Sequence, residues 1–308
     1  MTLRLIFVIV AALLFTSCFR HEQKTPGSNG EPGADSLAGL PPPPKMQVRL
    51  EPVRILDTVI ITDVTGAGTV MTFVTSIDTT KPHPIGARFD RVQAFTFAAQ
   101  DSSWHEALSD SFTVATSVVM RDVTGDGKPD MIISTTNGHD DSIAAIGCVI
   151  YSAHSGAWKE IFTAQTGNPT LQDIDNNGTQ DILLHDLYAG VMPPPDAITY
   201  ISDIYSFDGT TYTASKHKFP AYFQSLVATA TEAYTKEKTQ LPINIPITDE
   251  SDFTLYRPCA VVIVSFYATA DKIGVKKFWD QEKEYLSRML TSGQLIDLEA
   301  FVKSMATL

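Results

Sequence analysis

Three gapless copies of one short pattern are the feature of this chain that most limits its fold. The copies read DVTGAGTVMTFV from Asp63, DVTGDGKPDMII from Asp122 and DIDNNGTQDILL from Asp173. Each copy has an apolar second residue, a glycine at the sixth position and a β-prone run after the ninth. Self-similarity of this kind is typical of a repeat architecture, in which one supersecondary unit is used several times.

Each copy is followed by a second recurring feature, a pair of aromatic residues that flank a short polar stretch. The segments are FAAQDSSW, YSAHSGAW and YSFDGTTY, with the aromatic pairs Phe97 and Trp104, Tyr151 and Trp158, and Tyr205 and Tyr212. A β-prone run, a turn rich in Gly, Ser and Asp, and a returning run predict a β-hairpin in each case. The repeated unit is therefore predicted to be strand, acidic loop, strand, connection and hairpin.

The acidic loops of the second and third copies have the residue types of a calcium site. Calcium takes about six to eight oxygen ligands, which a short loop supplies by alternating side chains with a backbone carbonyl around a glycine turn. The candidate ligands are Asp122, Thr124, Asp126, the Lys128 carbonyl and Asp130 in the second copy, and Asp173, Asp175, Asn177, the Thr179 carbonyl and Asp181 in the third. Without a cation, the carboxylates of each loop would repel one another. The alternative interpretation is a turn rich in Asp and Gly that caps a strand without metal.

The first copy departs from this pattern at two positions. Ala67 and Met71 occupy its fifth and ninth positions, which leaves Asp63 and Thr65 as oxygen donors, so we expect no ion there. None of the copies is an EF-hand loop, because an EF-hand needs a glutamate at the twelfth position and helices on both sides.

Taken together, the loops and hairpins resemble FG-GAP and VCBS repeats, the blades of integrin α-subunit propellers and of many bacterial surface proteins. The resemblance covers about residues 46–220. It implies a mainly β domain of three blade-like repeats stabilised by calcium, followed by a small α-rich C-terminal segment. The loop aspartates would be the ligands, with Thr124 and Asn177 as neutral members. Because closed propellers usually need about four to eight blades, we expect a partial or open propeller, or one completed by divergent strands or by another chain.

The first part of the chain predicts export and membrane attachment. Arg4 precedes LIFVIVAALLF, an apolar run too short to span a bilayer and typical of a signal peptide. The following LFTSC resembles the lipobox of bacterial lipoproteins, which implies that residues 1–17 are removed and that Cys18 is lipidated. An ordinary signal peptide with a chance cysteine is the alternative.

Lipidation would place the chain in a bacterial cell envelope, anchored to the outer membrane and facing the periplasm or the surface. Residues 18–48 are rich in Pro, Gly and Ser, which predicts a disordered tether. Its run of four prolines, residues 41–44, is either a stiff spacer or a ligand for an aromatic groove.

After the β-repeat domain, assigned to residues 49–220, the sequence changes character. Residues 221–308 are predicted to form an α-rich segment with one buried strand, PCAVVIVSFY. Helices are expected from Pro220, from Asp271 and through LIDLEAFVKSM, the last capped by Ser292. The aromatic residues of the middle helix are either core or a docking face for a partner.

Composition and the remaining polar residues limit the function. The net charge of −12 argues against nucleic acid and anionic membrane surfaces as partners. Cys148 and Cys259 either pair or remain buried thiols. His139 beside Asp140 and Asp141, and His185 beside Asp186, are possible general bases or metal ligands. The alternative is that they are polar residues on a solvated rim, because adjacent strand residues point to opposite faces.

Three functions follow from these features. The favoured one is a calcium-binding, lipid-anchored envelope protein that serves as a binding or scaffold module for a protein or glycan ligand and is not an enzyme. A second is an envelope hydrolase that uses the repeats as a scaffold, although no G-x-S-x-G, H-E-x-x-H or phosphate-binding glycine motif is present. The third is a structural subunit of an envelope complex, whose open β edge pairs with a partner.

Overall fold

In a computed structural model the chain divides into two units, Met1–Pro42 and Pro43–Leu308. The structure describes residues 46–63, 70–84, 86–98, 102–136, 145–154, 157–193, 196–241 and 245–307, all in the second unit. The predictions for the signal peptide, for Cys18 and for the tether up to residue 45 lie outside these residues. Within the described ranges, no helix is long and apolar enough to cross a membrane.

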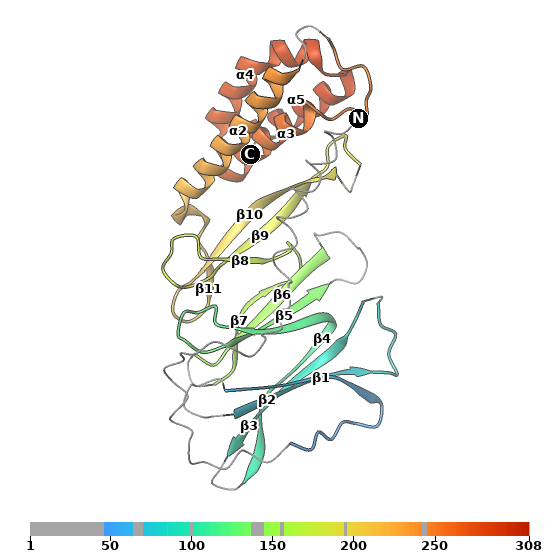
Figure 1. The fold of residues 1–308 in the computed structure, drawn as a ribbon, viewed down its shortest axis with the longest axis vertical. Coiled ribbons are helices and arrows are strands. Elements are labelled where there is room, and N and C mark those ends of the chain that lie inside the picture. Colours follow the sequence, from blue (N-terminus) through green and yellow to red (C-terminus); the bar gives the residue numbers. More distant parts are fainter. Residues whose placement is uncertain are drawn as a thin grey trace, which may run out of the picture. The chain divides into compact units, whose positions relative to one another are not determined.

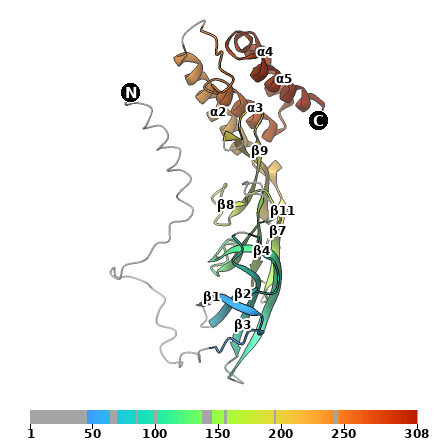
Figure 2. The ribbon, with the colours of Figure 1, turned by 90° about the vertical axis from the view of Figure 1, so that its right-hand side faces the viewer.

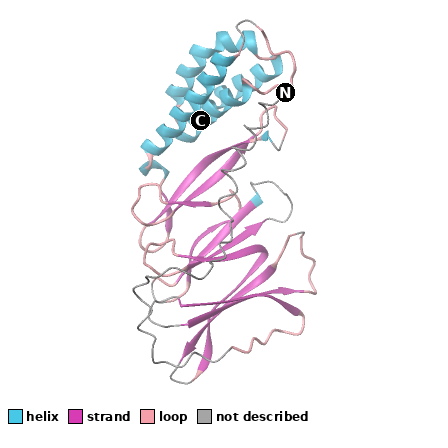
Figure 3. Ribbon diagram, viewed as in Figure 1, coloured by secondary structure: helices cyan, strands magenta, loops and turns pink. Residues whose placement is uncertain are grey.

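Two open antiparallel sheets followed by four helices make up the described part of the second unit (Figures 1 and 3). The first sheet has the order β1-β2-β3-β4-β5-β6-β7, and the second has the order β11-β10-β9-β8. The strands are β1 (Arg54–Asp63), β2 (Val70–Asp78), β3 (Phe89–Ala98), β4 (Ser103–Arg121), β5 (Asp130–Thr136), β6 (Ile146–Ser152), β7 (Lys159–Ala164), β8 (Thr170–Gln172), β9 (Asp181–Tyr188), β10 (Ile198–Phe207) and β11 (Tyr212–Ala214).

The long strand β4 allows the first sheet to hold two four-stranded meanders. Residues 103–111 of β4 pair with β3, residues 117–121 pair with β5, and Ala115 pairs with both neighbours. The first meander is thus β1, β2, β3 and the first half of β4, and the second is the other half of β4 with β5, β6 and β7. The second sheet, β8 to β11, is the third meander. Each of the three corresponds to one sequence repeat.

The three aromatic segments form the hairpins β3–β4, β6–β7 and β10–β11, as predicted. Phe97 pairs with Trp104 in the first hairpin, and Phe207 pairs with Tyr212 in the third. Tyr212 also packs edge-on against Phe162 of β7, with 5.8 Å between the ring centroids. One buried cluster therefore contains side chains of both sheets, including Ile150 and Phe162 from the first and Ile182 and Tyr212 from the second. It joins the second and third meanders.

The helices of the C-terminal part are α2 (Pro220–Gln240), α3 (Tyr256–Thr269), α4 (Lys272–Met289) and α5 (Ser292–Thr307). The prediction of a buried strand over PCAVVIVSFY is wrong, because this segment lies in α3. Its run of β-branched residues favours a strand locally, but the segment is buried around most of its circumference against the other helices. Periodicity cannot separate a buried strand from a buried helix. Pro258 fits in the first turn, where no intrahelical N–H is required.

Side-chain caps mark the starts of α4 and α5. The Asp271 carboxylate accepts a hydrogen bond from the Gly274 N–H at 2.8 Å and caps α4, which begins where the sequence predicted a helix. The cap of α5 is Thr291 and not Ser292. Thr291 Oγ1 accepts from the Gln294 N–H at 3.3 Å, and Gln294 Oε1 accepts from the Thr291 N–H at 3.4 Å. This reciprocal pair is a capping box.

The aromatic stripe of α4 belongs to the helical core. Phe278, Trp279 and Leu286 are buried in one cluster with α3 and α5 residues (Figure 2 shows α4 beside α5). The same cluster contains Ile198 of β10, so the helices also pack against the second sheet. Hydrogen bonds from the Tyr188 and Tyr256 hydroxyls to one oxygen of Asp297 reinforce this contact.

Candidate metal-binding loops

The two loops predicted to bind calcium share one backbone path. We call residues 122–130 the second loop and residues 173–181 the third loop. The fourth residue has a positive φ in both, +74° at Gly125 and +58° at Asn176. The sixth residue does as well, +79° at Gly127 and +87° at Gly178. Glycine and asparagine tolerate this region best, so the repeated sequence pattern dictates the repeated shape.

The first aspartate of each loop holds the turn together. Asp122 accepts hydrogen bonds from the N–H groups of Gly125 at 2.8 Å and Gly127 at 2.9 Å, one on each carboxylate oxygen. Asp173 does the same, with the N–H groups of Asn177 at 3.0 Å and Gly178 at 2.9 Å. The loop amides therefore point inward at a carboxylate in both repeats.

The ninth aspartate closes each loop from inside the protein. Asp130 and Asp181 are only 1% and 2% exposed. Each accepts from the backbone N–H of the second loop residue, Val123 at 2.9 Å and Ile174 at 3.2 Å. Burial raises the pKa of both carboxyl groups. Additional donors stabilise the charged forms, namely Thr124 and Ser152 at Asp130, and Ser206 at Asp181.

The loops differ at the third and fifth positions. In the second loop, Thr124 is buried, and Asp126 Oδ2 lies 3.2 Å from His154 Nδ1 and 4.0 Å from Lys128 Nζ. In the third loop, the fifth residue is Asn177, whose side-chain oxygen accepts the Thr179 N–H at 2.7 Å. The second loop thus has basic groups beside its fifth residue.

The third loop, in contrast, holds its acidic groups close to one another. Asp175 at the third position is exposed. After burial, the nearby charges of Asp175 and Asp173 are a further cause of the raised pKa of Asp181. The three carboxylates therefore lie within electrostatic range of one another, and a bound cation would relieve their repulsion.

The second and third loops also touch each other. The Gln180 N–H donates to the Val123 carbonyl at 2.9 Å, and the Tyr212 hydroxyl lies within hydrogen-bonding distance of both Val123 O (3.1 Å) and Gln180 O (2.9 Å). A Cβ placed on Gly125 would lie 3.0 Å from the Gly178 carbonyl oxygen. The two loops thus form one acidic surface across the second and third meanders.

The donor atoms of this surface fit calcium in type. Carboxylate, amide, hydroxyl and backbone carbonyl oxygens are what this hard cation prefers, and an oxygen that accepts one N–H still has a lone pair to offer. In arrangement, however, no group of three or more His, Cys, Asp or Glu side chains among the described residues is placed to hold a metal ion. Calcium binding would therefore require the side chains at positions three and five to change conformation, so that their oxygen atoms approach the first aspartate of the loop.

The other predicted site residues do not form a common site in the described ranges. Residues 64–69 of the first loop, and His139, Asp140 and Asp141, lie outside those ranges. His185 Nε2 lies 2.8 Å from Thr170 Oγ1, and burial lowers the pKa of His185. Asp186, its neighbour on β9, is exposed and accepts a hydrogen bond from the Tyr200 hydroxyl at 3.2 Å. His185 and Asp186 thus have separate polar partners.

The two described cysteines are free and buried. Cys148 belongs to the cluster between the sheets, whereas Cys259 belongs to the helical cluster around α3. Burial raises the pKa of the Cys148 thiol to about 12, and it also raises that of Cys259. Both side chains therefore act as core residues and do not form a disulfide.

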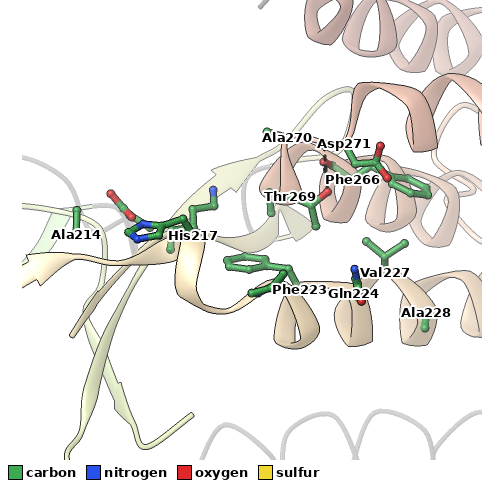
Figure 4. Close-up of a pocket in the computed structure, with 14 residues that line it drawn as sticks. Ala214, His217, Phe223, Gln224, Val227, Ala228, Phe266, Thr269, Ala270 and Asp271 are labelled. Atoms are coloured by element: carbon green, nitrogen blue, oxygen red, sulfur yellow. Dashed lines mark hydrogen bonds between the residues drawn. The ribbon is translucent and has the colours of Figure 1, made fainter. Parts of the chain in front are cut away.

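A pocket of about 760 Å³ between α2 and the end of α3 is a feature that the sequence did not reveal (Figure 4). Figure 4 shows Phe223 and Val227 of α2 facing Phe266 and Thr269 of α3 across it. Lys216, from the short 3-10 helix η5 (Lys216–Lys218), also lines it. Its Nζ donates to the Ser202 carbonyl at 2.8 Å.

The charges of this pocket do not select a ligand. Burial lowers the pKa of Lys216, and the nearby charge of Asp203 opposes that shift. Asp203 and Asp271 both line the pocket with Lys216, so neither sign of charge dominates. The lining residues come mainly from β10, η5, α2 and α3. Because the sequence pattern predicted a strand where α3 lies, it did not predict a pocket between these elements.

Neither the protein-family models nor the curated proteins include a match to this chain. The resemblance to FG-GAP and VCBS repeats therefore remains a prediction based on the loops and hairpins.

Proposed function

We propose that this chain is a calcium-ordered β-repeat protein of the FG-GAP and VCBS type, a partial propeller that serves as a binding or scaffold module. The observation that carries the proposal is the shared conformation of the second and third loops at equivalent places in two meanders. Two sequences that differ at several positions keep the aspartates at positions one and nine and the positive-φ residues at positions four and six.

In this proposal, calcium stabilises the fold and does not take part in catalysis. The ion in the second loop would be held by Asp122, Thr124, Asp126, the Lys128 carbonyl and Asp130, and the ion in the third by Asp173, Asp175, Asn177, the Thr179 carbonyl and Asp181. With free calcium at about a hundred times the dissociation constant, one site adds roughly 2.7 kcal/mol to the free energy of unfolding. The two ions would order adjacent loops, and this ordered surface would contact a protein or glycan.

The place of action is the bacterial cell envelope, with attachment through a lipid on Cys18. This part of the proposal is supported by the apolar run after Arg4 and by the LFTSC segment. Metabolic labelling with a radioactive fatty acid is expected to label the full chain and not its Cys18→Ser variant. Equal labelling of both would contradict lipidation at Cys18.

The calcium proposal is tested by thermal unfolding of residues 43–308, the second compact unit, in calcium, in magnesium and in chelator. The test variant is Asp126→Asn with Asp175→Asn, because these side chains do not close the loops from inside. The control variant is Asp208→Asn, which changes an exposed acidic residue in the β10–β11 turn. We expect calcium to raise the midpoint of the wild type and the control and to have little effect on the test variant. Coincident melts of the wild type in all three conditions would overturn the proposal.

A second candidate function, a subunit of an envelope assembly, is favoured by the outer strand of the first sheet. β1 ends the strand order, and Ile55, Leu56, Val59 and Ile61 on it are exposed. An exposed apolar edge strand is a template for pairing with another chain. Sedimentation of residues 43–308 is expected to show association that Ile55→Lys with Ile61→Lys removes. A monomer at all concentrations, with no binding to envelope extract, would contradict this candidate.

A further inference from the structure

A groove of about 730 Å³ lies between α4 and α5, which run side by side in Figure 2. Apolar side chains of both helices contribute to it, namely Val275 and Trp279 from α4 and Val302 from α5. Val275 and Trp279 are buried, so they form part of a fixed apolar floor. The groove is separate from the loops of the proposed calcium sites.

Lysines dominate the charged residues of this groove. Its lining includes Lys272, Lys276, Lys277 and Lys303, but only two acidic residues, Asp280 and Glu299. The charge is thus positive in a chain whose net charge is −12.

Ion pairs neutralise only some of the lysines that line this groove. Lys276 pairs with Asp280, while Lys303 Nζ lies 3.6 Å from Glu299 Oε1, which also accepts from Lys283. The Asp271 carboxylate, next to Lys272 in the sequence, keeps its negative charge, but it caps α4 and forms no ion pair with a lysine in the described ranges. Lys272 and Lys277 form no ion pair with any residue in the described ranges. These two lysines therefore remain available to an external anion.

An exposed isoleucine stands among these lysines. Ile273, in the first turn of α4, is 83% exposed and lines the groove with its sequence neighbour Lys272. Lys276 and Lys277 follow three and four positions later, which places them on the same side of the helix. An exposed apolar side chain beside lysines presents the two residue types that contact a membrane interface.

We propose that the α4–α5 groove docks onto the surface of an anionic lipid bilayer. The lysines contact the phosphate groups of the lipids, and Ile273 enters the boundary between headgroups and acyl chains. A bilayer supplies both a dense negative charge and an apolar layer, which matches the two chemistries that the groove presents. The proposal goes beyond the calcium-ordered module, because it concerns different residues and requires neither an ion nor a lipid on Cys18.

The test uses residues 43–308, which lack Cys18 and the apolar N-terminal run, in the presence of chelator. Co-sedimentation is measured with vesicles of phosphatidylcholine alone and with vesicles that contain phosphatidylglycerol in addition. We expect binding to the anionic vesicles only, and we expect its loss in concentrated sodium chloride, which screens exposed charges. Because no calcium is present, the outcome does not depend on the proposed calcium sites.

Two pairs of variants assign the binding to the groove. One lysine near an anionic surface strengthens partitioning about fivefold, so Lys272→Gln with Lys277→Gln is expected to weaken binding about 25-fold. The control is Lys159→Gln with Lys218→Gln, which removes the same charge from exposed positions outside the groove. Ile273→Ser is expected to weaken binding about tenfold. Its control is Ile296→Ser, at an isoleucine on α5 that is 65% exposed and lies outside the groove lining.

Three results would overturn the proposal. Equal binding to neutral and anionic vesicles would exclude recognition of negative charge. Equal weakening by the groove variants and their controls would show that net charge or general surface apolarity is responsible. Release from the vesicles by inorganic phosphate at an ionic strength where sodium chloride does not release would indicate a site for free phosphate. Far-ultraviolet circular dichroism checks folding, and the exposed Ile273 allows a change of side chain without loss of core packing.

Discussion

The second and third loops have the same backbone but balance their charges in different ways. In the second loop, the acidic fifth residue Asp126 lies beside Lys128 and His154. In the third loop, Asp173 and Asp175 lie near the buried Asp181 and contribute to its raised pKa. The positive-φ residues at positions four and six define the shape of both loops. Under the proposed calcium binding, the side chains at positions three and five determine how strongly each loop depends on the ion.

Two copies of the repeat thus keep one backbone conformation while the charges around it differ. The second loop offsets part of its negative charge with residues of the chain itself. We expect the second loop to keep its conformation in chelator better than the third loop. In the third loop the carboxylates repel one another, and no basic side chain in the described part of the chain lies beside the fifth residue to offset this repulsion.

Removal of the ninth aspartate should affect the second loop more than the third. Asp130 accepts from Val123, Thr124 and Ser152, whereas Asp181 accepts from Ile174 and Ser206. A buried donor left without a partner costs about 1–3 kcal/mol. We expect a loss of about 3 kcal/mol for Asp130→Ala and about 2 kcal/mol for Asp181→Ala, measured by urea unfolding in chelator. An equal loss of stability at both positions would show that Asp130 and Asp181 stabilise their loops to the same extent.

The contact between the loops should make one glycine less replaceable than another. Gly125 and Gly127 both have positive φ, which costs an alanine roughly 1–2 kcal/mol. Only at Gly125 would the new Cβ also meet the third loop, 3.0 Å from Gly178 O and 3.2 Å from Thr179 Oγ1. We expect Gly125→Ala to cost about 2–3 kcal/mol and Gly127→Ala about 1 kcal/mol in urea unfolding. Similar losses for Gly125→Ala and Gly127→Ala would show that the second and third loops can move apart to accept the new Cβ at little cost in stability.

Much of this site could be predicted from the sequence, because its determinants are local. A glycine or asparagine at position four and a glycine at position six adopt positive φ for steric reasons that depend on the residue itself. An aspartate at position one can reach the amides of the same turn without help from distant parts of the chain. The hairpins are local as well, because the paired strands are close in sequence, as in the pairing of Phe97 with Trp104.

The features that the sequence did not reveal depend on tertiary packing. The segment around Cys259 has strand-like composition, and only burial among other helices makes it part of α3. The contact between Gly125 and Gly178 joins two repeats, and no pattern within one repeat encodes it. The strand β4 serves two meanders because its two halves meet different neighbours.

Both buried aspartates should make the stability of the fold depend on pH. A carboxyl group whose pKa is raised in the folded state favours folding in its protonated form. Its contribution is complete below the ordinary value of 3.8 and is lost as the pH rises through the raised pKa. Acidification from neutral pH should therefore stabilise the wild type relative to Asp130→Asn and to Asp181→Asn, which cannot titrate there.

Calcium should reduce this pH dependence at both aspartates. Burial raises the pKa of both carboxyl groups, and repulsion by Asp173 and Asp175 adds to the shift at Asp181. An ion bound by the carboxylate favours the ionised form by direct attraction and opposes these causes. Urea unfolding of each Asn variant and the wild type at several pH values, with calcium and with chelator, measures the effect. A pH dependence that calcium leaves unchanged at both positions would contradict binding of the ion by these carboxylates.

The smallest expected effect is the shift of the melting midpoint caused by Asp126→Asn and Asp175→Asn. It distinguishes the two loops because its sign should differ between them. In chelator, Asp175→Asn removes repulsion with Asp173 and Asp181, so the melting midpoint should rise by about 1 °C. Asp126→Asn removes attraction to Lys128 and weakens the contact with His154 Nδ1, so the midpoint should fall by a similar amount. In calcium, both variants should lower the midpoint, because each removes a ligand. Asp208→Asn, in a turn without a proposed ion, should respond in the same way with calcium and with chelator. If Asp175→Asn and Asp126→Asn shifted the midpoint in the same direction in chelator, the basic neighbours of Asp126 would not protect the second loop, and the two loops would depend equally on calcium.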